Sequence, residues 1–444
     1  TTGVLYVLDE PSIGLHPANV DGLLGVMEDL RSDGNSVVFV DHDVQVLARA
    51  DHLVEIGPAS GAGGGTVVAT GTVADLAASG RSRLAGFLTG AEDVVVRARV
   101  SPDEVFSVGR IHLTTTAVHT VHPLDVDLPV GRLTAVTGVS GSGKTTLVLD
   151  SLVPALRGEP VPHVASLDAP VGLRVHVVDA TPIGVNVRST VATYSGVMDD
   201  LRAAYARLPE AGADGLTGSD FSYNTGSRGN SLACPRCEGT GRISLDVQFL
   251  PDVDIVCPDC HGTRYSPTAD RYRRDGVSLP RLLSMTVDEA LATVTGLARV
   301  RRRLAAFAEL GLGYLTLGEA TPALSGGEAQ RLKLVNELHR DQSDAVFVLD
   351  EPSVGLHPAD VRDLLAVLQR LCDRGATVLV IEHDLDMVAN ADHVIDMGPG
   401  GGADGGRIVA TGSPDEIAAD RASVTGRYLR AHLYGESHDN HRSR

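Results

Sequence analysis

One segment of the chain occurs twice, and this repeat constrains the fold more than any other feature. Residues 5–71 and 346–412 align without a gap at a constant offset of 341 positions. In the two copies "VLDEPSIGLHPANV" matches "VLDEPSVGLHPADV", "VFVDHD" matches "LVIEHD" and "VVATGT" matches "IVATGS". So many matches at one offset indicate two copies of one module. The chain opens on an apolar run, residues 3–8, that is typical of a central strand, so we expect the rest of the first copy to lie upstream of Thr1.

The second copy alternates strand-like and helix-like segments. Residues 345–349 and 376–381 are apolar runs of strand length, and residues 359–371 carry apolar side chains at helical spacing. This pattern predicts an α/β fold with a parallel sheet and crossover helices. The expected division is the end of the first module at 1–90, a linker at 91–110, the start of the second module at 111–155, an insert at 156–320, the remainder of the second module at 321–433 and a disordered tail at 434–444.

A phosphate-binding loop opens the second module. "GVSGSGKT" satisfies G-x-x-x-x-G-K-[ST], follows an apolar strand and precedes an apolar-periodic helix. The glycines let backbone N–H groups surround phosphate oxygens, Lys144 supplies positive charge, and the Thr145 hydroxyl suits Mg²⁺. The sequence thus predicts an ATP site at Gly138, Val139, Ser140, Gly141, Ser142, Gly143, Lys144, Thr145 and Thr146.

Two carboxylates end the strand at residues 345–349. Asp350 takes the place at which a P-loop ATPase holds Mg²⁺. Glu351 is the candidate general base for an attacking water. Without the P-loop, a helix cap or a solvated turn would be the better explanation for such a pair of acids.

Four of the five cysteines fall in two tight pairs, Cys234 with Cys237 and Cys257 with Cys260. The spacing C-x₂-C-x₁₉-C-x₂-C predicts two knuckles that bind one Zn²⁺ through four thiolates, a closed structural site. His261 adjoins the last cysteine and is a weaker candidate ligand because four sulfurs suffice.

Composition sets the broad class. Hydrophobic residues make up 43% of the 444 residues, the longest apolar runs are strand-sized, and no signal peptide is recognisable, so we expect a cytoplasmic protein that does not span a membrane. The net charge of −19 argues against nucleic-acid binding. Residues 221–310, however, contain 12 Arg against 10 Asp plus Glu, a local balance of +2.

The segment "LSGGEAQRLKL" places a Ser-Gly-Gly turn at a helix start. By itself it could be a simple capped helix, but with the P-loop and the acids it resembles the signature motif of ABC-type ATPases. The resemblance implies that Ser325, Gly326 and Gly327 contact nucleotide. It also identifies His383, and His42 in the first copy, with the family's switch histidine, so the implied catalytic residues are Glu351, His383 and Lys144.

A four-cysteine insert between P-loop and signature, together with "FLPDV", "GTRY" and "ATYSGV", is similar to UvrA and its close paralogues. The resemblance extends over nearly the whole chain and corresponds to the second half of UvrA. It implies an ATPase that recognises damaged duplex DNA in nucleotide excision repair without being a nuclease, that forms homodimers, and that meets UvrB through the half upstream of Thr1. In this family each ATP site takes its signature from the other module.

The resemblance also implies DNA contacts from arginines around the zinc module, for which a solvated charged face is the alternative. The candidates are Arg228, Arg236, Arg242, Arg264, Arg271, Arg273 and Arg274.

The sequence departs from UvrA at Ala180, where the family carries a glutamine near Mg²⁺ and the attacking water. A UvrA-like paralogue that confers resistance to DNA-binding drugs therefore stays open. So does a nucleotide-binding DNA clamp with little turnover. The zinc insert opposes a transporter-type or translation-type ABC ATPase.

Overall fold

The computed structural model describes all residues except 1, 58–63, 180, 182, 184–185, 187, 226–229, 246–252, 336, 338–341 and 436–444. The chain divides into two compact units, one formed by residues Thr1–Ala180 and Arg340–Arg444 and the other by Thr181–His339. We call them the ATPase unit and the insert unit. In the described part of the chain, no helix is long and apolar enough to cross a membrane.

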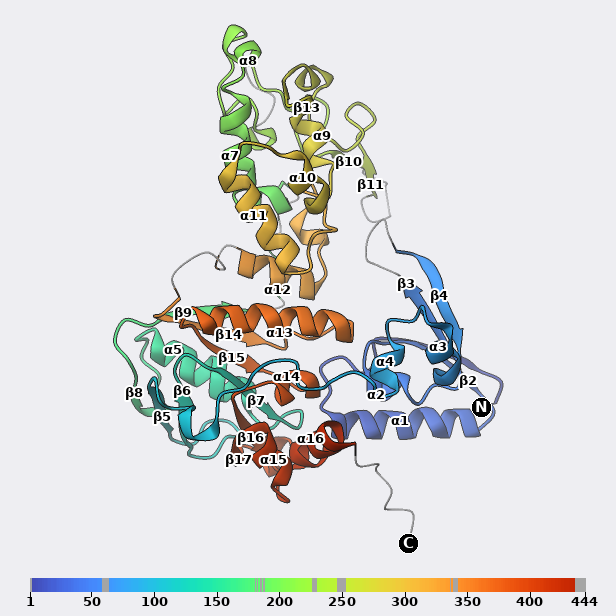
Figure 1. Cartoon of the computed structure of the whole chain (residues 1–444), viewed down its shortest axis with the longest axis vertical. Helices are drawn as coiled ribbons and strands as arrows, with labels where there is room; N and C mark the ends of the chain where they lie inside the picture. Colours follow the sequence, from blue (N-terminus) through green and yellow to red (C-terminus); the bar gives the residue numbers. More distant parts are fainter. Residues whose placement is uncertain are drawn as a thin grey trace. The chain divides into compact units, whose positions relative to one another are not determined.

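A six-stranded sheet forms the centre of the ATPase unit, in the order β17-β16-β7-β15-β14-β9 (Figure 1). Only β17 is antiparallel to its neighbour. The expected parallel α/β fold is therefore confirmed. The strands are β7 (Leu133–Gly138), β9 (Arg174–Val178), β14 (Ala345–Asp350), β15 (Thr377–Ile381), β16 (His393–Gly398) and β17 (Arg407–Gly412).

The central strands are buried on both faces. Every residue of β7, β15 and β16 is buried, which explains why their sequences do not alternate between apolar and polar residues. Helix α13 (Pro358–Asp373) begins with a proline in its first turn and buries one apolar stripe. The remaining helices of this module are η3 (Thr146–Leu152), α5 (Val153–Leu156), α14 (Leu385–Ala389), η7 (Gly402–Asp404), α15 (Pro414–Ala419) and α16 (Val424–Tyr434).

A second, antiparallel sheet in the order β6-β5-β8 shares its core with the large sheet. Its strands are β5 (Arg110–Thr115), β6 (Asp125–Pro129) and β8 (Val164–Asp168). Ahead of it, the segment 91–109 contains the short helix η2 (Pro102–Glu104).

The first copy folds like the second but in two separate pieces. Strands β1 (Leu5–Asp9) and β2 (Ser36–Val40) pair in parallel, whereas β3 (Leu53–Gly57) and β4 (Thr66–Gly71) pair antiparallel in another sheet. In the second copy β7 lies between the equivalent strands β15 and β16 and joins them. The helices of the first copy are α1 (Pro17–Ser32), α2 (Val44–Leu47), α3 (Val73–Ser79) and α4 (Ala85–Leu88).

The insert unit is mostly helical, with short strands. Its helices are α6 (Val191–Tyr194), α7 (Val197–Tyr205), α8 (Pro209–Ala213), η4 (Tyr223–Thr225), η5 (Pro267–Arg271), α9 (Leu279–Leu283), α10 (Val287–Thr293), α11 (Ala298–Glu309), η6 (Thr321–Ala323) and α12 (Gly326–Val335). Its strands form two antiparallel pairs, β10 (Arg242–Leu245) with β11 (Val253–Val256), and β12 (Arg273–Arg274) with β13 (Val277–Ser278).

Candidate nucleotide site and metal centre

The P-loop connects the buried strand β7 to helix η3. Close packing explains its glycines. A Cβ on Gly138 would lie 1.9 Å from the Met397 carbonyl oxygen, and one on Gly143, at φ +98°, would lie 2.5 Å from a Val121 methyl carbon. Only glycine fits at either place.

Polar groups in the loop suit a phosphate. Lys144 is buried, and its Nζ donates to the carbonyls of Gly138 at 2.9 Å and Val139 at 3.1 Å. The Ser140 and Ser142 hydroxyls are buried and have no hydrogen-bond partner in the described part of the chain. Phosphate oxygens would satisfy these donors, so the residues present fit ATP.

Burial lowers the pKa of Lys144 to about 8, although Glu351, Asp396 and Asp350 oppose the shift. Three carboxylates thus act on the ammonium group, and two of them are the predicted acids. The P-loop lysine and the acidic pair therefore form one electrostatic cluster. Thr145 and Thr146 begin the following helix.

A glycine-rich turn supports the loop from behind. Gly402 N–H donates to the Gly141 carbonyl and Gly406 N–H donates to the Ser142 carbonyl, each at 3.0 Å. A Cβ on Gly401 would lie 2.4 Å from the Ser140 carbonyl oxygen. The sequence indicated a turn at residues 398–406 but gave no sign that it contacts the P-loop.

The acidic pair ends β14 as predicted. Burial, followed by the charge of Glu351, raises the pKa of Asp350. Glu351 has a left-handed backbone, φ 46°, and its Oε1 lies 3.3 Å from His383 Nε2. In the first copy Glu10 has φ 44° and lies 3.6 Å from His42. Both copies thus keep a glutamate in a strained conformation that aims it at the histidine.

One buried carboxylate shapes the histidine loop. Glu382 accepts backbone N–H groups from Ser353 and His383, each at 2.8 Å, and from Asp384 at 3.1 Å. In the first copy Asp41 accepts the equivalent backbone N–H groups, those of Ser12, His42 and Asp43. Sequence reasoning passed over this residue. The available signal was an acid before the histidine in both copies.

The first copy also reaches the second copy's site, which the sequence did not reveal. A Cβ on Gly14 would lie 3.2 Å from Glu351 Oε2, and the His16 ring lies 5.9 Å from the His383 ring. Residues from both copies therefore surround the Glu351–His383 pair.

The signature-like turn lies in the insert unit, whereas the P-loop, the acids and His383 lie in the ATPase unit. Ser325 caps α12 reciprocally: its N–H donates to Glu328 Oε2 at 2.7 Å, and its hydroxyl accepts from the Glu328 N–H at 3.3 Å. Ser325 and Gly326 are exposed and Gly327 is half-buried, so the turn presents polar groups to a ligand. Ala180 lies outside the described residues.

The four paired cysteines converge in the insert unit. All are buried, and their sulfur atoms lie within 4.8 Å of one another. The Sγ–Sγ distances are 3.9 Å between Cys234 and Cys257 and 3.6 Å between Cys237 and Cys260. Four thiolates about 2.3 Å from a central zinc would lie about 3.8 Å apart. The cluster therefore fits a tetrahedral zinc ion, and exposed His261 is not part of it.

The two knuckles have the same backbone geometry. Glu238 and His261, which follow the second cysteine of each pair, both have φ 49°. Thr240 and Thr263 then donate their hydroxyls to the carbonyls of Cys237 and Cys260, at 2.7 Å and 2.8 Å. The turns within each knuckle thus position its two cysteines, and the two knuckles together can bind one ion.

The arginines near this cluster fall into two groups. Arg236, Arg242, Arg271 and Arg273 are exposed and Arg274 is half-buried, whereas Arg228 lies outside the described residues. Three of them have acidic neighbours: Arg236 pairs with Asp259, Arg271 with Asp214 and Arg274 with Asp275.

Arg264 does not fit the expectation of a surface contact. Its side chain is buried, its guanidinium lies 5.3 Å from the Tyr223 ring centre, and burial lowers its pKa. It packs inside the zinc module over an aromatic face, so we leave it out of the proposed DNA contacts.

A P-loop sheet, an acidic pair with a histidine, and a capped signature-like turn are the elements of the ABC-type ATPase fold, which here carries a four-cysteine insert. No protein-family model matches the chain. Among curated proteins, the UvrABC system protein A of Aquifex aeolicus (strain VF5) is 42% identical over 446 residues, which cover 98% of this chain and 47% of that protein. The UvrABC system protein A of Bacillus subtilis (strain 168) is 41% identical, with 97% and 45% covered.

Solved structures agree. The crystal structure of UvrA2 from Deinococcus radiodurans has a TM-score of 0.89 and 42% identity and covers 98% of this chain and 52% of that one. A ribosome-bound archaeal Pelota and ABCE1 model, at a TM-score of 0.51 and 18% identity over 96% of this chain and 59% of that one, shows the fold alone. The resemblance to UvrA is thereby confirmed over nearly the whole chain, which spans about half the length of the curated relatives it matches.

Proposed function

We propose that this chain is part of an ATP-binding and ATP-hydrolysing subunit that recognises damaged duplex DNA in nucleotide excision repair. The observation that carries the proposal is the Glu351–His383 pair, 3.3 Å apart and electrostatically coupled through Glu351 to the buried P-loop lysine. The similarity to UvrABC system protein A, over 98% of this chain and 47% of that protein, supports the repair role.

In this mechanism the P-loop backbone and Lys144 hold the β- and γ-phosphates. Thr145 and Asp350 offer the oxygen ligands that Mg²⁺ prefers, and the ion would neutralise charge on the phosphates. Glu351 accepts the proton of the attacking water, because its carboxylate is held by a strained backbone next to His383. His383 orients that water and the γ-phosphate through Nε2. Ser325, Gly326 and Gly327 would contact the nucleotide of the other ATP site, because each site takes its signature from the other module.

The zinc cluster has a structural role in this proposal. Zn²⁺ held by Cys234, Cys237, Cys257 and Cys260 cross-links the two knuckles and leaves no position open for a substrate.

DNA binding is assigned to the exposed arginines around the cluster, Arg236, Arg242, Arg271 and Arg273, with Arg274 beside them. Contacts to phosphates position a protein without reading sequence, which suits recognition of a distorted duplex. The resemblance further implies a homodimer, the loading of UvrB through the half upstream of Thr1, and action in the cytoplasm.

ATP binding and turnover, each measured with and without damaged duplex DNA, test the proposal. Lys144→Ala should abolish binding, whereas Lys333→Ala, at the only other lysine, should retain it. Glu351→Gln should keep ATP binding and lower turnover by about 10²-fold or more, because the general base is lost. If the unaltered protein binds ATP and DNA without any turnover, the nucleotide-binding clamp is the correct function instead.

A further inference from the structure

His16 is a completely buried histidine to which the proposed mechanism gives no role. It belongs to the first copy, where it precedes helix α1, yet its side chain bonds to Thr425 of the second module, 409 residues away. A buried imidazole that bridges two copies of a module needs an explanation.

The hydrogen bonds around His16 fix its protonation. The Ala18 N–H donates to Nδ1 at 3.1 Å, so Nδ1 carries no proton. Thr425 donates its hydroxyl proton to Asp396 Oδ1 at 2.7 Å, so the hydroxyl oxygen must accept from His16 Nε2, 3.0 Å away. Burial, followed by the electrostatic effects of His383, Lys144 and Arg427, lowers the pKa of His16 to about 3. His16 is therefore a neutral donor in a chain that ends on a buried carboxylate.

This series of hydrogen bonds holds the first-copy loop against the candidate catalytic pair, Glu351 and His383. The His16 ring meets the His383 ring edge to face at 5.9 Å, and Gly14, two residues earlier, lies against Glu351 Oε2. His383 Nδ1 is buried and has no hydrogen-bond partner in the described part of the chain. The orientation of the His383 ring therefore depends on its packing and on the contact of Nε2 with Glu351.

The second copy has the same histidine but not the same chain. His357 caps α13 as His16 caps α1, with the Ala359 N–H donating to Nδ1 at 3.1 Å. Both rings also pack edge-on against an aromatic ring, His357 against Phe87 at 6.2 Å and His16 against Tyr428 at 5.9 Å. The repeat places Leu84, which has no hydroxyl, where the other copy has Thr425. The two loops therefore differ in what anchors them.

We propose that His16 is a positioning residue for ATP hydrolysis at the Lys144 site: the His16–Thr425–Asp396 chain holds the first copy's Ser12–Pro17 loop against His383 and Glu351. This inference rests on the proposed function and names a residue from outside the second module that its site requires. Loss of these hydrogen bonds lets the Glu351–His383 pair leave its productive geometry, while the P-loop still binds ATP.

The variants separate anchoring from helix capping. Asn at position 16 keeps an oxygen for the Ala18 N–H but cannot reach Thr425, whereas Gln places a donor near the position of Nε2. His16→Asn should lower kcat about tenfold with the ATP Kd changed less than about twofold, and His16→Gln should recover most of the loss. Thr425→Val should match His16→Asn, and the double variant should be no worse than either, because both remove one interaction.

A second measurement does not depend on turnover. In full-length chains labelled with ¹³C at the histidine rings, the His383 resonance, assigned with His383→Gln, should shift in His16→Asn and stay in place in His357→Asn. If the unaltered protein binds ATP but does not hydrolyse it, the proposed hydrolysis fails, and the His383 resonance still decides whether His16 positions that ring. Three outcomes would each overturn the inference: an unmoved His383 resonance, equal losses of kcat in His16→Asn and His16→Gln, or additive effects of His16→Asn and Thr425→Val on kcat.

Discussion

At the scale of single residues, the site is a small group of buried and half-buried charged side chains that act on one another. Lys144 lies among three carboxylates, and burial still outweighs them. Glu351 keeps a left-handed backbone, and the same strain recurs at Glu10 in the other copy. Strain that is retained in both copies of a repeat indicates a function for it, because a glycine there would cost less.

The pKa of Lys144 predicts how ATP affinity depends on pH. Binding needs the ammonium charge, and the pKa of about 8 means that the free protein loses this charge as pH rises above that value. ATP affinity should be flat below pH 8 and fall above it, approaching about tenfold per pH unit, because binding must then take up a proton. Calorimetry in two buffers of different ionisation enthalpy measures that uptake. Lys144→Arg, which stays charged, should show no such fall.

Which of these residues could be found from sequence depended on whether their partners are close in the chain. The P-loop, the acidic pair and the cysteine pairs are contiguous motifs, so their chemistry could be read directly. His16 could not, because its partner Thr425 is 409 positions away and a lone histidine carries no motif. The burial of Arg264, which was expected to contact DNA, could not be read from the sequence for the same reason, since only the fold places Tyr223 beneath it.

At the scale of secondary-structure elements, the two copies give a matched test of burial. Seven apolar side chains in the strands of the first copy are exposed, and each has a buried or half-buried counterpart 341 positions later. In the second copy these positions belong to the core that β7 shares, with Ile408 packed at its edge. The exposed residues are Leu5, Val7, Val38, Val40, Val54, Ile56 and Val67.

One pair of equivalent valines should therefore respond differently to the same change. Val348 is 0% exposed and Val7 is 70% exposed. Val348→Thr should lower the free energy of unfolding by about 1–2 kcal/mol, because it buries a hydroxyl in an apolar core. Val7→Thr should change it by less than about 0.5 kcal/mol. Urea unfolding of both variants measures the difference, and equal losses would mean that the first-copy strand is covered in solution.

The cysteine knuckles allow a prediction about metal content. Purified protein should hold one Zn²⁺ per chain, and Cys257→Ala should lose it, because three thiolates leave the tetrahedral site open. Elemental analysis measures this, with Cys372→Ala, outside the cluster, as the control that keeps its metal. The metal-free variant should be cleaved faster by protease between the knuckles, since the hairpin β10–β11 connects them. A full complement of zinc in Cys257→Ala would refute the four-thiolate assignment.

At the scale of the whole molecule, the repeat predicted the parallel sheet but not how the two copies meet. The apolar pattern of one copy determines its own strands and helices, and those agree with the structure. Contacts between copies use single polar residues at unrelated positions. Tyr428 of α16, for example, donates its hydroxyl proton to Asp21 of α1, and no periodic pattern in the sequence predicts such a bond.

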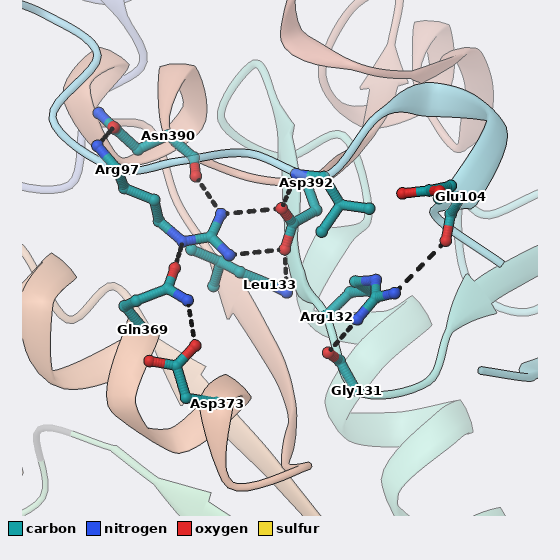
Figure 2. Close-up of polar contacts among 10 residues, drawn as sticks. Arg97, Glu104, Gly131, Arg132, Leu133, Gln369, Asp373, Asn390 and Asp392 are labelled. Carbon is teal, nitrogen blue, oxygen red and sulfur yellow. Dashed lines mark hydrogen bonds and ion pairs between the residues drawn. The ribbon is translucent and has the colours of Figure 1, made fainter. Parts of the chain in front are cut away.

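The segment between the copies, residues 91–110, also makes a contact that the sequence did not predict. Arg97, expected in a linker, forms a buried ion pair with Asp392 (Figure 2). Its guanidinium donates to both carboxylate oxygens, at 3.0 and 2.8 Å, and to the Asn390 carbonyl. Asp392 also accepts the backbone N–H groups of Val100 and Leu133, which ties this segment to the start of β7. One carboxylate thus joins the inter-copy segment to the P-loop strand.

The repeat supplies the control for a test of this junction. Asp51 is the counterpart of Asp392, but it is exposed and pairs with Arg31 at the surface. Arg97→Leu should destabilise the protein by about 3–5 kcal/mol, because it leaves a buried carboxylate without its counter-charge. Arg31→Leu should cost less than about 0.5 kcal/mol, because water screens that pair. Urea unfolding compares the two, and protease sensitivity near residues 91–100 should rise only in Arg97→Leu. A loss below about 1 kcal/mol for Arg97→Leu would show that the segment is held by its other contacts, and that the ion pair is not what fixes it to the second module.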